Sequence, residues 1–129
     1  MDMQMVDSTL AALEKHDFQT AHFPTVEQAV DWLDGQIPDG AKVGVGGSVS
    51  VRSSGLLERL AARGAEILDH WKPGLSAEEK KELFFQTQRA DVYLCSANAV
   101  TADGFILNVE SSGRPLLWPQ APVYAGWHQ

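Results

Sequence analysis

Two polar segments of the sequence carry residue types that can hold a small anion. In the first, Gly46–Ser50, the glycines Gly46 and Gly47 and the hydroxyl groups of Ser48 and Ser50 follow an apolar run. Glycine lets the backbone turn sharply or approach a ligand closely, and the N–H groups of such a turn attract negative charge. The segment therefore predicts an anion-binding turn. The alternative is an ordinary strand–helix turn in which Ser48 or Ser50 caps the helix.

This turn matches none of the common phosphate or nucleophile motifs. Val49 stands where G-x-G-x-x-G requires its last glycine, and no Gly-Lys-Ser/Thr follows as in a P-loop. Ser50 replaces the final glycine of G-x-S-x-G, which argues against a nucleophile elbow at Ser48. Binding is therefore expected through backbone N–H groups and hydroxyls.

The second polar segment runs from residue 96 to residue 114 and begins on an apolar strand pattern. The amide of Asn98 can hold a ligand oxygen or tie neighbouring loops together. Glu110 and Arg114 are opposite charges that are close enough in sequence to act jointly on a substrate. For Asn98 and Glu110 a ligand role and a structural role both stay open, whereas Asp103-Gly104 is expected to form only a hairpin turn.

Other reactive side chains favour structural roles. The four histidines lie on different predicted elements without the spacing of a zinc site, so we expect neither a metal nor a cofactor. His70 follows a strand at the sheet end of the Gly46–Ser50 turn and is the histidine that can reach it, with capping or packing as the commoner role. Cys95 lies in an apolar strand and should pack as a small hydrophobe. Trp71 is likewise expected to pack.

Length and composition indicate one globular domain over residues 1–129. A chain of 129 residues with 44% hydrophobic and 21% charged residues can build one core. A single cysteine and an acidic N-terminus without an apolar run predict a cytoplasmic protein with no signal peptide or membrane span. The net charge of −7 repels nucleic-acid phosphates and anionic lipid, so we expect neither as a partner. A local backbone site can still hold a small anion.

Helix and strand patterns alternate along the chain and must position both polar segments. Helical spacing of apolar residues predicts helices over 3–16, 25–37, 51–63 and 76–88. Apolar runs predict strands over 18–23, 42–46, 65–68, 91–95 and 122–125, with a hairpin between 99–101 and 105–109. Thr25 and Ser76 fit capping boxes at two of the helix starts. The pattern indicates an α/β fold, a mostly parallel Rossmann-like sheet with helices on both faces. Ligands bind such sheets at the carboxyl ends of the strands, where both polar segments begin.

Several strings in this sequence together resemble the LUD (lactate-utilisation) domain family in its small single-domain form. They are Gly-Gly-Ser-Val-Ser at 46–50, Asp-His-Trp-Lys-Pro-Gly at 69–74 and, most specifically, Asn-Ala-Val-Thr-x-Asp-Gly at 98–104. The resemblance covers about residues 5–114. Arg114 follows Gly113 directly, where the family usually has an intervening Asn, and the part after residue 114 is expected to be atypical or shortened.

The resemblance implies a fold related to the sugar-phosphate isomerase and CoA-transferase superfamily. It also implies an association with lactate oxidation to pyruvate through an iron–sulfur complex. The first functional hypothesis is therefore an accessory protein of lactate oxidation that binds a small anionic metabolite, such as a 2-hydroxy or 2-oxo acid, beside iron–sulfur subunits. The ligand-facing positions that the resemblance implies are Gly46, Gly47, Ser48, Ser50, Asn98, Thr101, Asp103, Glu110, Gly113 and Arg114.

Two further functions stay open, and with them the question of whether the chain is an enzyme. One is an isomerase or acyl/CoA transferase on the related fold, in which Glu110 would be the catalytic base or nucleophile. The other is a non-catalytic domain for subunit association. An apolar sheet edge left exposed by the short C-terminal part favours a homodimer in that case.

Overall fold

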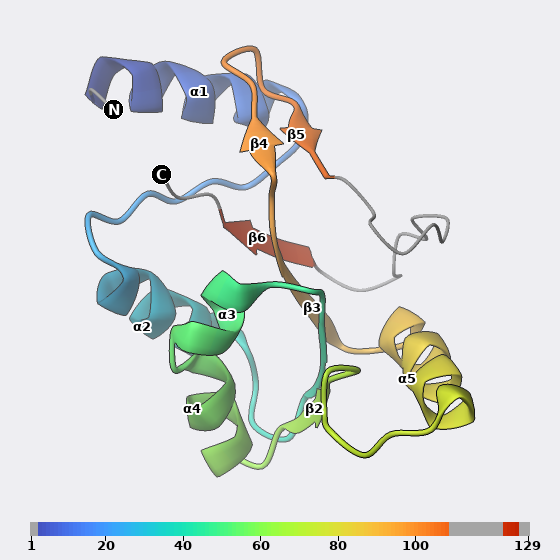
Figure 1. Cartoon of the computed structure of the whole chain (residues 1–129). Coiled ribbons are helices and arrows are strands. Elements are labelled where there is room, and N and C mark those ends of the chain that lie inside the picture. The colour runs from blue at the N-terminus through green and yellow to red at the C-terminus, as the bar shows by residue number, and fades with distance from the viewer. Residues whose placement is uncertain (1–2, 109–122, 127–129) are drawn as a thin grey trace.

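The centre of the fold is a parallel β-sheet. The computed structural model describes residues 3–108 and 123–126 (Figure 1). The strand order in this sheet is β2-β1-β3-β6, and every neighbouring pair is parallel. The strands are β1 (Lys42–Val45), β2 (Glu66–Leu68), β3 (Val92–Ser96) and β6 (Val123–Gly126). The predicted parallel sheet is therefore confirmed.

Helices precede β1, β2 and β3 along the chain. They are α1 (Met3–Lys15), α2 (Val26–Gln36), α3 (Val49–Ser53), α4 (Leu56–Ala62) and α5 (Ala77–Gln88). The Thr25 hydroxyl caps α2, and Ser76 and Glu79 form a complete capping box at the start of α5, which confirms both predicted helix starts. Within the described residues, no helix combines the length and apolarity that crossing a bilayer requires.

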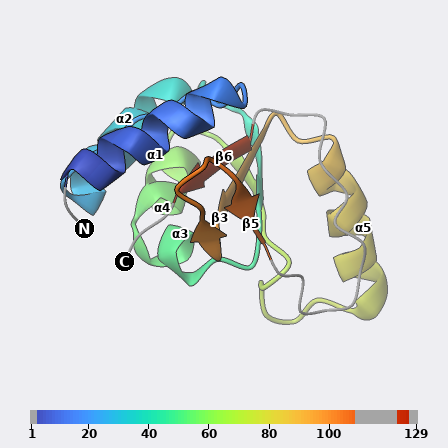
Figure 2. The ribbon, with the colours of Figure 1, turned by 90° about the horizontal axis from the view of Figure 1, so that it is seen from above.

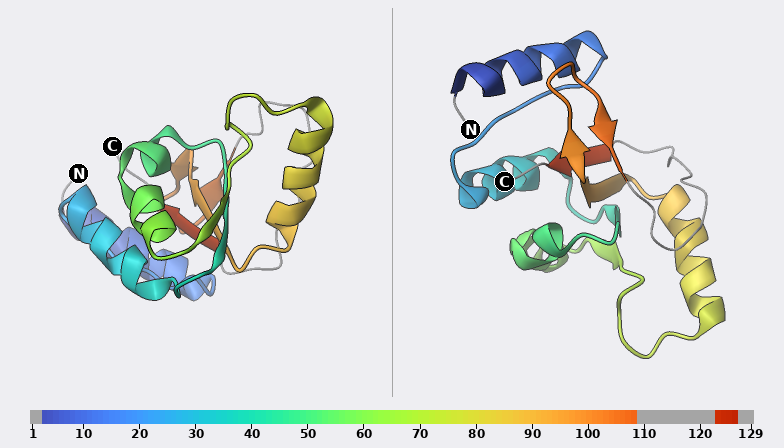
Figure 3. Two further views of the ribbon diagram at one scale, coloured as in Figure 1. Left: turned by 90° about the horizontal axis from the view of Figure 1, so that it is seen from below. Right: turned by 45° about the horizontal axis from the view of Figure 1, so that its top comes forward.

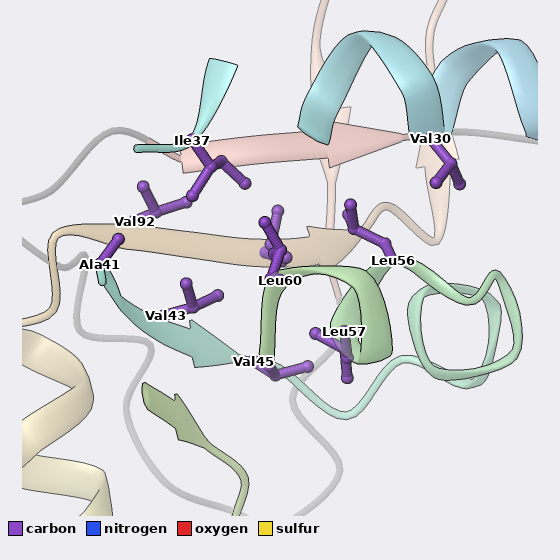
Figure 4. Packing of buried hydrophobic residues seen from close by; sticks show 10 residues of the cluster. Val30, Ile37, Ala41, Val43, Val45, Leu56, Leu57, Leu60 and Val92 are labelled. Atoms are coloured by element: carbon purple, nitrogen blue, oxygen red, sulfur yellow. The ribbon is translucent and has the colours of Figure 1, made fainter. Parts of the chain in front are cut away.

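One face of the sheet carries the hydrophobic core. Val43 and Val45 of β1 are in register with Val92 and Leu94 of β3, so their side chains share a face. On this face they pack against α4 and α2, with Leu60 in the middle of the cluster (Figure 4). These side chains are at most 4% exposed.

The opposite face of the sheet is covered by α5. This helix packs against β1 and β2, and it lies across the sheet from α2 and α4 (Figures 2 and 3). No residue of α5 is fully buried. The sheet thus has helices on both faces, as predicted, but one face is packed far more closely than the other.

The predicted strand over 18–23 is wrong. The chain turns after α1 at Asp17, whose φ is 67°, and residues 18–23 form no regular structure before α2. Phe18 is 39% exposed. Alternation of apolar and polar residues makes a strand only where a neighbouring strand supplies hydrogen bonds, and none of the described strands lies beside this segment.

The predicted helix over 51–63 is in fact two helices. Gly55 separates α3 from α4 with a left-handed φ of 85°. An α-helix cannot continue through this conformation, so the chain changes direction there. The apolar spacing of the leucines in α4 did not reveal the break.

The predicted hairpin is present and packs on the first helix. β4 (Ala99–Val100) pairs antiparallel with β5 (Ile106–Leu107). The ring of His16, the residue directly after α1, lies 4.6 Å from that of Phe105, and its Nδ1 is 2.8 Å from the Gly104 carbonyl oxygen. The hairpin therefore extends from the sheet towards α1 (Figure 1).

Candidate functional site

The strand order reverses between β1 and β3, and this makes their carboxyl ends a topological switch point. From β1 the chain passes through α3 and α4 to β2 on one side, whereas β3 lies on the other side of β1. The Gly46–Ser50 turn leaves β1 and Ser96 ends β3 at the same edge. Open α/β sheets bind ligands at such a point.

Ser48 joins these two strand ends. Its Oγ accepts a hydrogen bond of 3.1 Å from the N–H of Val51, which makes Ser48 the N-cap residue of α3. The same Oγ lies 2.9 Å from the Oγ of Ser96. Ser48 is only 4% exposed. Its hydroxyl therefore positions the turn, which agrees with the capping alternative of the sequence analysis.

Backbone N–H groups of the turn remain available to an anion. The N–H of Gly46 donates a hydrogen bond to the carbonyl oxygen of Leu94, and the N–H of Ser48 donates one to the carbonyl oxygen of Gly46. No described residue accepts a hydrogen bond from the N–H of Gly47 or Val49, and both residues are exposed. The first N–H groups of a helix have no acceptor within it, so the start of α3 leaves the Val49 donor unused.

Arg52, which the sequence analysis did not select, holds the turn in place. Its Nη1 donates to the carbonyl oxygens of Gly46 at 2.6 Å and Ser48 at 3.2 Å, and its Nη2 donates to Asp69 Oδ1 at 2.6 Å. Its guanidinium carbon lies 3.9 Å from the ring centroid of Trp71. The side chain is 16% exposed, so water screens these contacts only weakly.

Asp69 is the counter-charge of Arg52 and follows β2 directly. Burial of its carboxyl raises the pKa, but hydrogen bonds from Arg52 and from the Trp71 N–H outweigh burial and bring the pKa below its ordinary value. The carboxylate is thus ionised at neutral pH. Asp69 could have been predicted as a site residue because it is a charged residue that directly follows a strand at the carboxyl edge of the sheet. The signal for Arg52 is its position one helical turn after Ser48.

The described residues of the second polar segment lie in two different places, at the edge of the sheet and in the hairpin. Asn98 lies two residues after β3 at the same edge as the turn, and its N–H donates to Leu107 at 3.1 Å. Thr101 accepts a hydrogen bond from the Phe105 N–H through Oγ1, and Asp103 lies exposed at the hairpin tip. Because the hairpin points towards α1 and away from α3, Thr101 and Asp103 are not brought to the turn (Figure 3).

The remaining predicted positions are partly outside the described residues. Gly46, Gly47 and Ser50 lie together around Ser48 in the turn and the first turn of α3. The predicted positions outside the described residues are Glu110, Gly113 and Arg114.

Other candidate groups have defined surroundings. Within residues 3–108 and 123–126, no three His, Cys, Asp or Glu side chains gather as a metal site would require. Burial raises the pKa of the Cys95 thiol, which suits a packed and protonated side chain. His70 lines a cleft together with Trp71, the residue that contacts Arg52.

A comparison of the sequence with protein-family models found a match. The LUD domain family model matches residues 6–122. The match includes the turn, the Arg52–Asp69 pair and the hairpin, and it continues past residue 114. Comparisons with curated proteins and with solved structures found no match.

Proposed function

The chain belongs to the LUD domain family, a family associated with lactate utilisation, and on this premise we propose that it binds a small anionic metabolite. The metabolite is a 2-hydroxy or 2-oxo acid, and the protein is an accessory component of lactate oxidation to pyruvate. The observation that carries the proposal is the meeting of the Gly46–Ser50 turn with Ser96 at the switch point of the sheet.

The proposed binding mode rests on backbone donors. The N–H groups of Gly47 and Val49 donate to the carboxylate, because neither has another acceptor among the described residues. The Arg52–Asp69 pair is neutral as a unit, so it holds the carbonyl groups of the turn instead of supplying net positive charge. Asn98, at the neighbouring strand end, binds the 2-hydroxy or 2-oxo oxygen.

The proposal also includes a partner for the redox step. Oxidising lactate to pyruvate releases two electrons and two protons, and an acceptor must take up the electrons. An iron–sulfur cluster is commonly held by four thiolates, whereas this sequence has one cysteine. We therefore assign the electron acceptor to partner subunits with iron–sulfur clusters, in line with the family's association with lactate utilisation.

Replacing Val49 by proline tests the turn with little disturbance. Val49 is the first residue of α3, where proline is well tolerated, and Ser48 has the extended backbone that precedes proline readily. Val49→Pro removes one proposed N–H donor. In calorimetric titrations with lactate, pyruvate and phosphate we expect wild type to bind and Val49→Pro to bind roughly three- to tenfold more weakly.

The matched control is Val26→Pro, at the first position of α2. Val26 is 62% exposed and Val49 is 68% exposed, so the two substitutions have similar structural consequences. We expect the control to bind like wild type. Equal affinities of the two proline variants, or no binding of any of these anions by wild type, would overturn the proposal. An Asn98→Ala variant should weaken lactate binding more than acetate binding, because acetate lacks the second oxygen.

A further inference from the structure

A cleft of about 420 Å³ opens beside the proposed anion turn. It is formed by residues 70–75 with Lys80 of α5. Trp71 lies between the cleft and the turn. It lines the cleft, and its Cζ2 is 3.4 Å from the position that a Cβ on Gly47 would occupy. The half-exposed indole therefore lies beside Gly47, on the side where a Cβ would stand.

The cleft has positive charge that the protein does not neutralise. Lys72 and Lys80 both line it, and no described residue forms an ion pair with either ammonium group. By contrast, Arg52, Arg59 and Arg63 are all paired with aspartates. In a chain of net charge −7, two unpaired lysines in one cleft are a local exception that attracts an anion.

The neighbouring surface limits where a negative group can go. A second cleft of about 430 Å³ meets the first at Lys72 and Leu75. Its rim carries Glu66, Glu79 and Glu82, which repel an acid. Because Lys72 lines both clefts, an acidic group that extends past Trp71 is favoured on the side of Lys72 that faces Lys80 and the first cleft.

From these observations we propose that the ligand of this protein is an extended anion with two acidic groups. One group binds the N–H donors of the turn, the connecting part lies along Trp71, and the second group lies between Lys72 and Lys80. The inference rests on the proposed function and deepens it by naming the ligand class. The cleft, of about 420 Å³, has room for a connecting chain longer than that of a three-carbon acid.

The test compares α,ω-dicarboxylates, from succinate to suberate, with monocarboxylates of equal length by calorimetry. For wild type we expect the second carboxylate to strengthen binding roughly three- to tenfold at the best chain length. In Lys72→Gln/Lys80→Gln this gain should disappear, while lactate binding stays unchanged. The matched control, Lys42→Gln/Lys81→Gln, removes the same charge from two exposed lysines outside the cleft and should keep the gain.

The outcomes separate this inference from the proposed function. If dicarboxylates bind no better than monocarboxylates, or if both double variants lose the gain equally, the second group is not held in the cleft. Lactate binding that is still lowered by Val49→Pro would then leave the proposed function standing. If instead dicarboxylates bind through the lysines and Val49→Pro has no effect on any acid, the cleft binds anions but the turn does not, and the ligand does not span the two.

Discussion

Arg52 is the residue on which the geometry of the turn depends. Its guanidinium contacts the carbonyl oxygens of Gly46 and Ser48, the carboxylate of Asp69 and the ring of Trp71. These contacts tie α3 and the ends of β1 and β2 into one unit. A backbone site needs such support, because N–H donors bind an anion only when the turn that carries them is rigid.

Removal of the Arg52 side chain should therefore destabilise the protein. We expect Arg52→Ala to lower the free energy of unfolding by about 1–3 kcal/mol, because Asp69 and two carbonyl oxygens lose their donor. Urea unfolding followed by circular dichroism measures the loss. Arg89→Ala, at the exposed end of α5, is the control and should change stability by less than about 0.5 kcal/mol. Equal effects of the two variants would contradict this role.

The Asp69–Arg52 pair should also make stability depend on pH. The pKa of Asp69 is below its ordinary value of 3.8 in the folded protein, so folding favours the ionised form. The resulting stability is complete above the unfolded-state pKa and is lost as the pH falls through the lower folded-state pKa. We expect Asp69→Asn to be less stable than wild type at pH 7, and the gap to close below about pH 4. Urea titrations at successive pH values measure it; a constant gap from pH 7 to pH 3 would disprove the linkage.

At the scale of secondary-structure elements, the break between α3 and α4 allows the Gly46–Ser50 turn to lie at the switch point of the sheet. α3 starts at the Ser48 cap beside β3, whereas α4 packs along the core face of the sheet. One straight helix could not do both. Gly55 makes the change of direction with its left-handed backbone.

The left-handed conformation of Gly55 predicts that alanine at this position lowers the stability of the protein. Alanine at Gly35 is the control and should change stability in the opposite direction. Nothing lies within 4 Å of a Cβ on Gly55, so Gly55→Ala acts only through its φ of 85° and should cost about 1–2 kcal/mol. Gly35 lies inside α2 with similar open space and no left-handed φ. Gly35→Ala should therefore raise stability by about 0.5–1 kcal/mol. Thermal or urea unfolding gives both values, and a shift of the same sign in both variants would refute the explanation.

For the molecule as a whole, the two faces of the sheet contribute unequally to stability. The α2–α4 face contains the cluster around Val43, Val45 and Leu60. The α5 face has no fully buried helix residue, and Phe85 is 52% exposed. The proposed ligand cleft lies at the start of α5, on the less tightly packed side. Binding regions are commonly found where local stability is low.

Replacing one leucine by alanine on each side of the sheet should show that the two faces contribute unequally to stability. Leu60 is 1% exposed, and Leu60→Ala should cost about 2–5 kcal/mol because it leaves a cavity in the core. Leu83 of α5 is half-buried, and Leu83→Ala should cost about 1 kcal/mol. Hydrogen exchange should likewise be faster in α5 than in α4. Similar costs for the two leucines would show that the faces are equally important.

Much of the fold could be predicted because its signals lie within a few adjacent residues. The Ser76–Glu79 capping box and the apolar run of β3 were read directly. The strand over 18–23 and the continuous helix over 51–63 were wrong for physical reasons. A strand depends on a partner elsewhere in the chain, and the φ of Gly55 depends on how α4 must pack.

The local parts of the candidate site could be predicted from residues that are neighbours in the chain. The glycine pair before a helix start and the Ser48 cap are neighbours in the chain, so their types and spacing are sufficient to predict a turn with N–H donors. Which distant residues meet at this turn depends on how the strands are arranged in the folded protein. Ser96 reaches Ser48, and Asp69 reaches Arg52, because β3 and β2 flank β1. The same packing carries Thr101 and Asp103 away with the hairpin. Strand order depends on the packing of the whole chain, which no local pattern encodes.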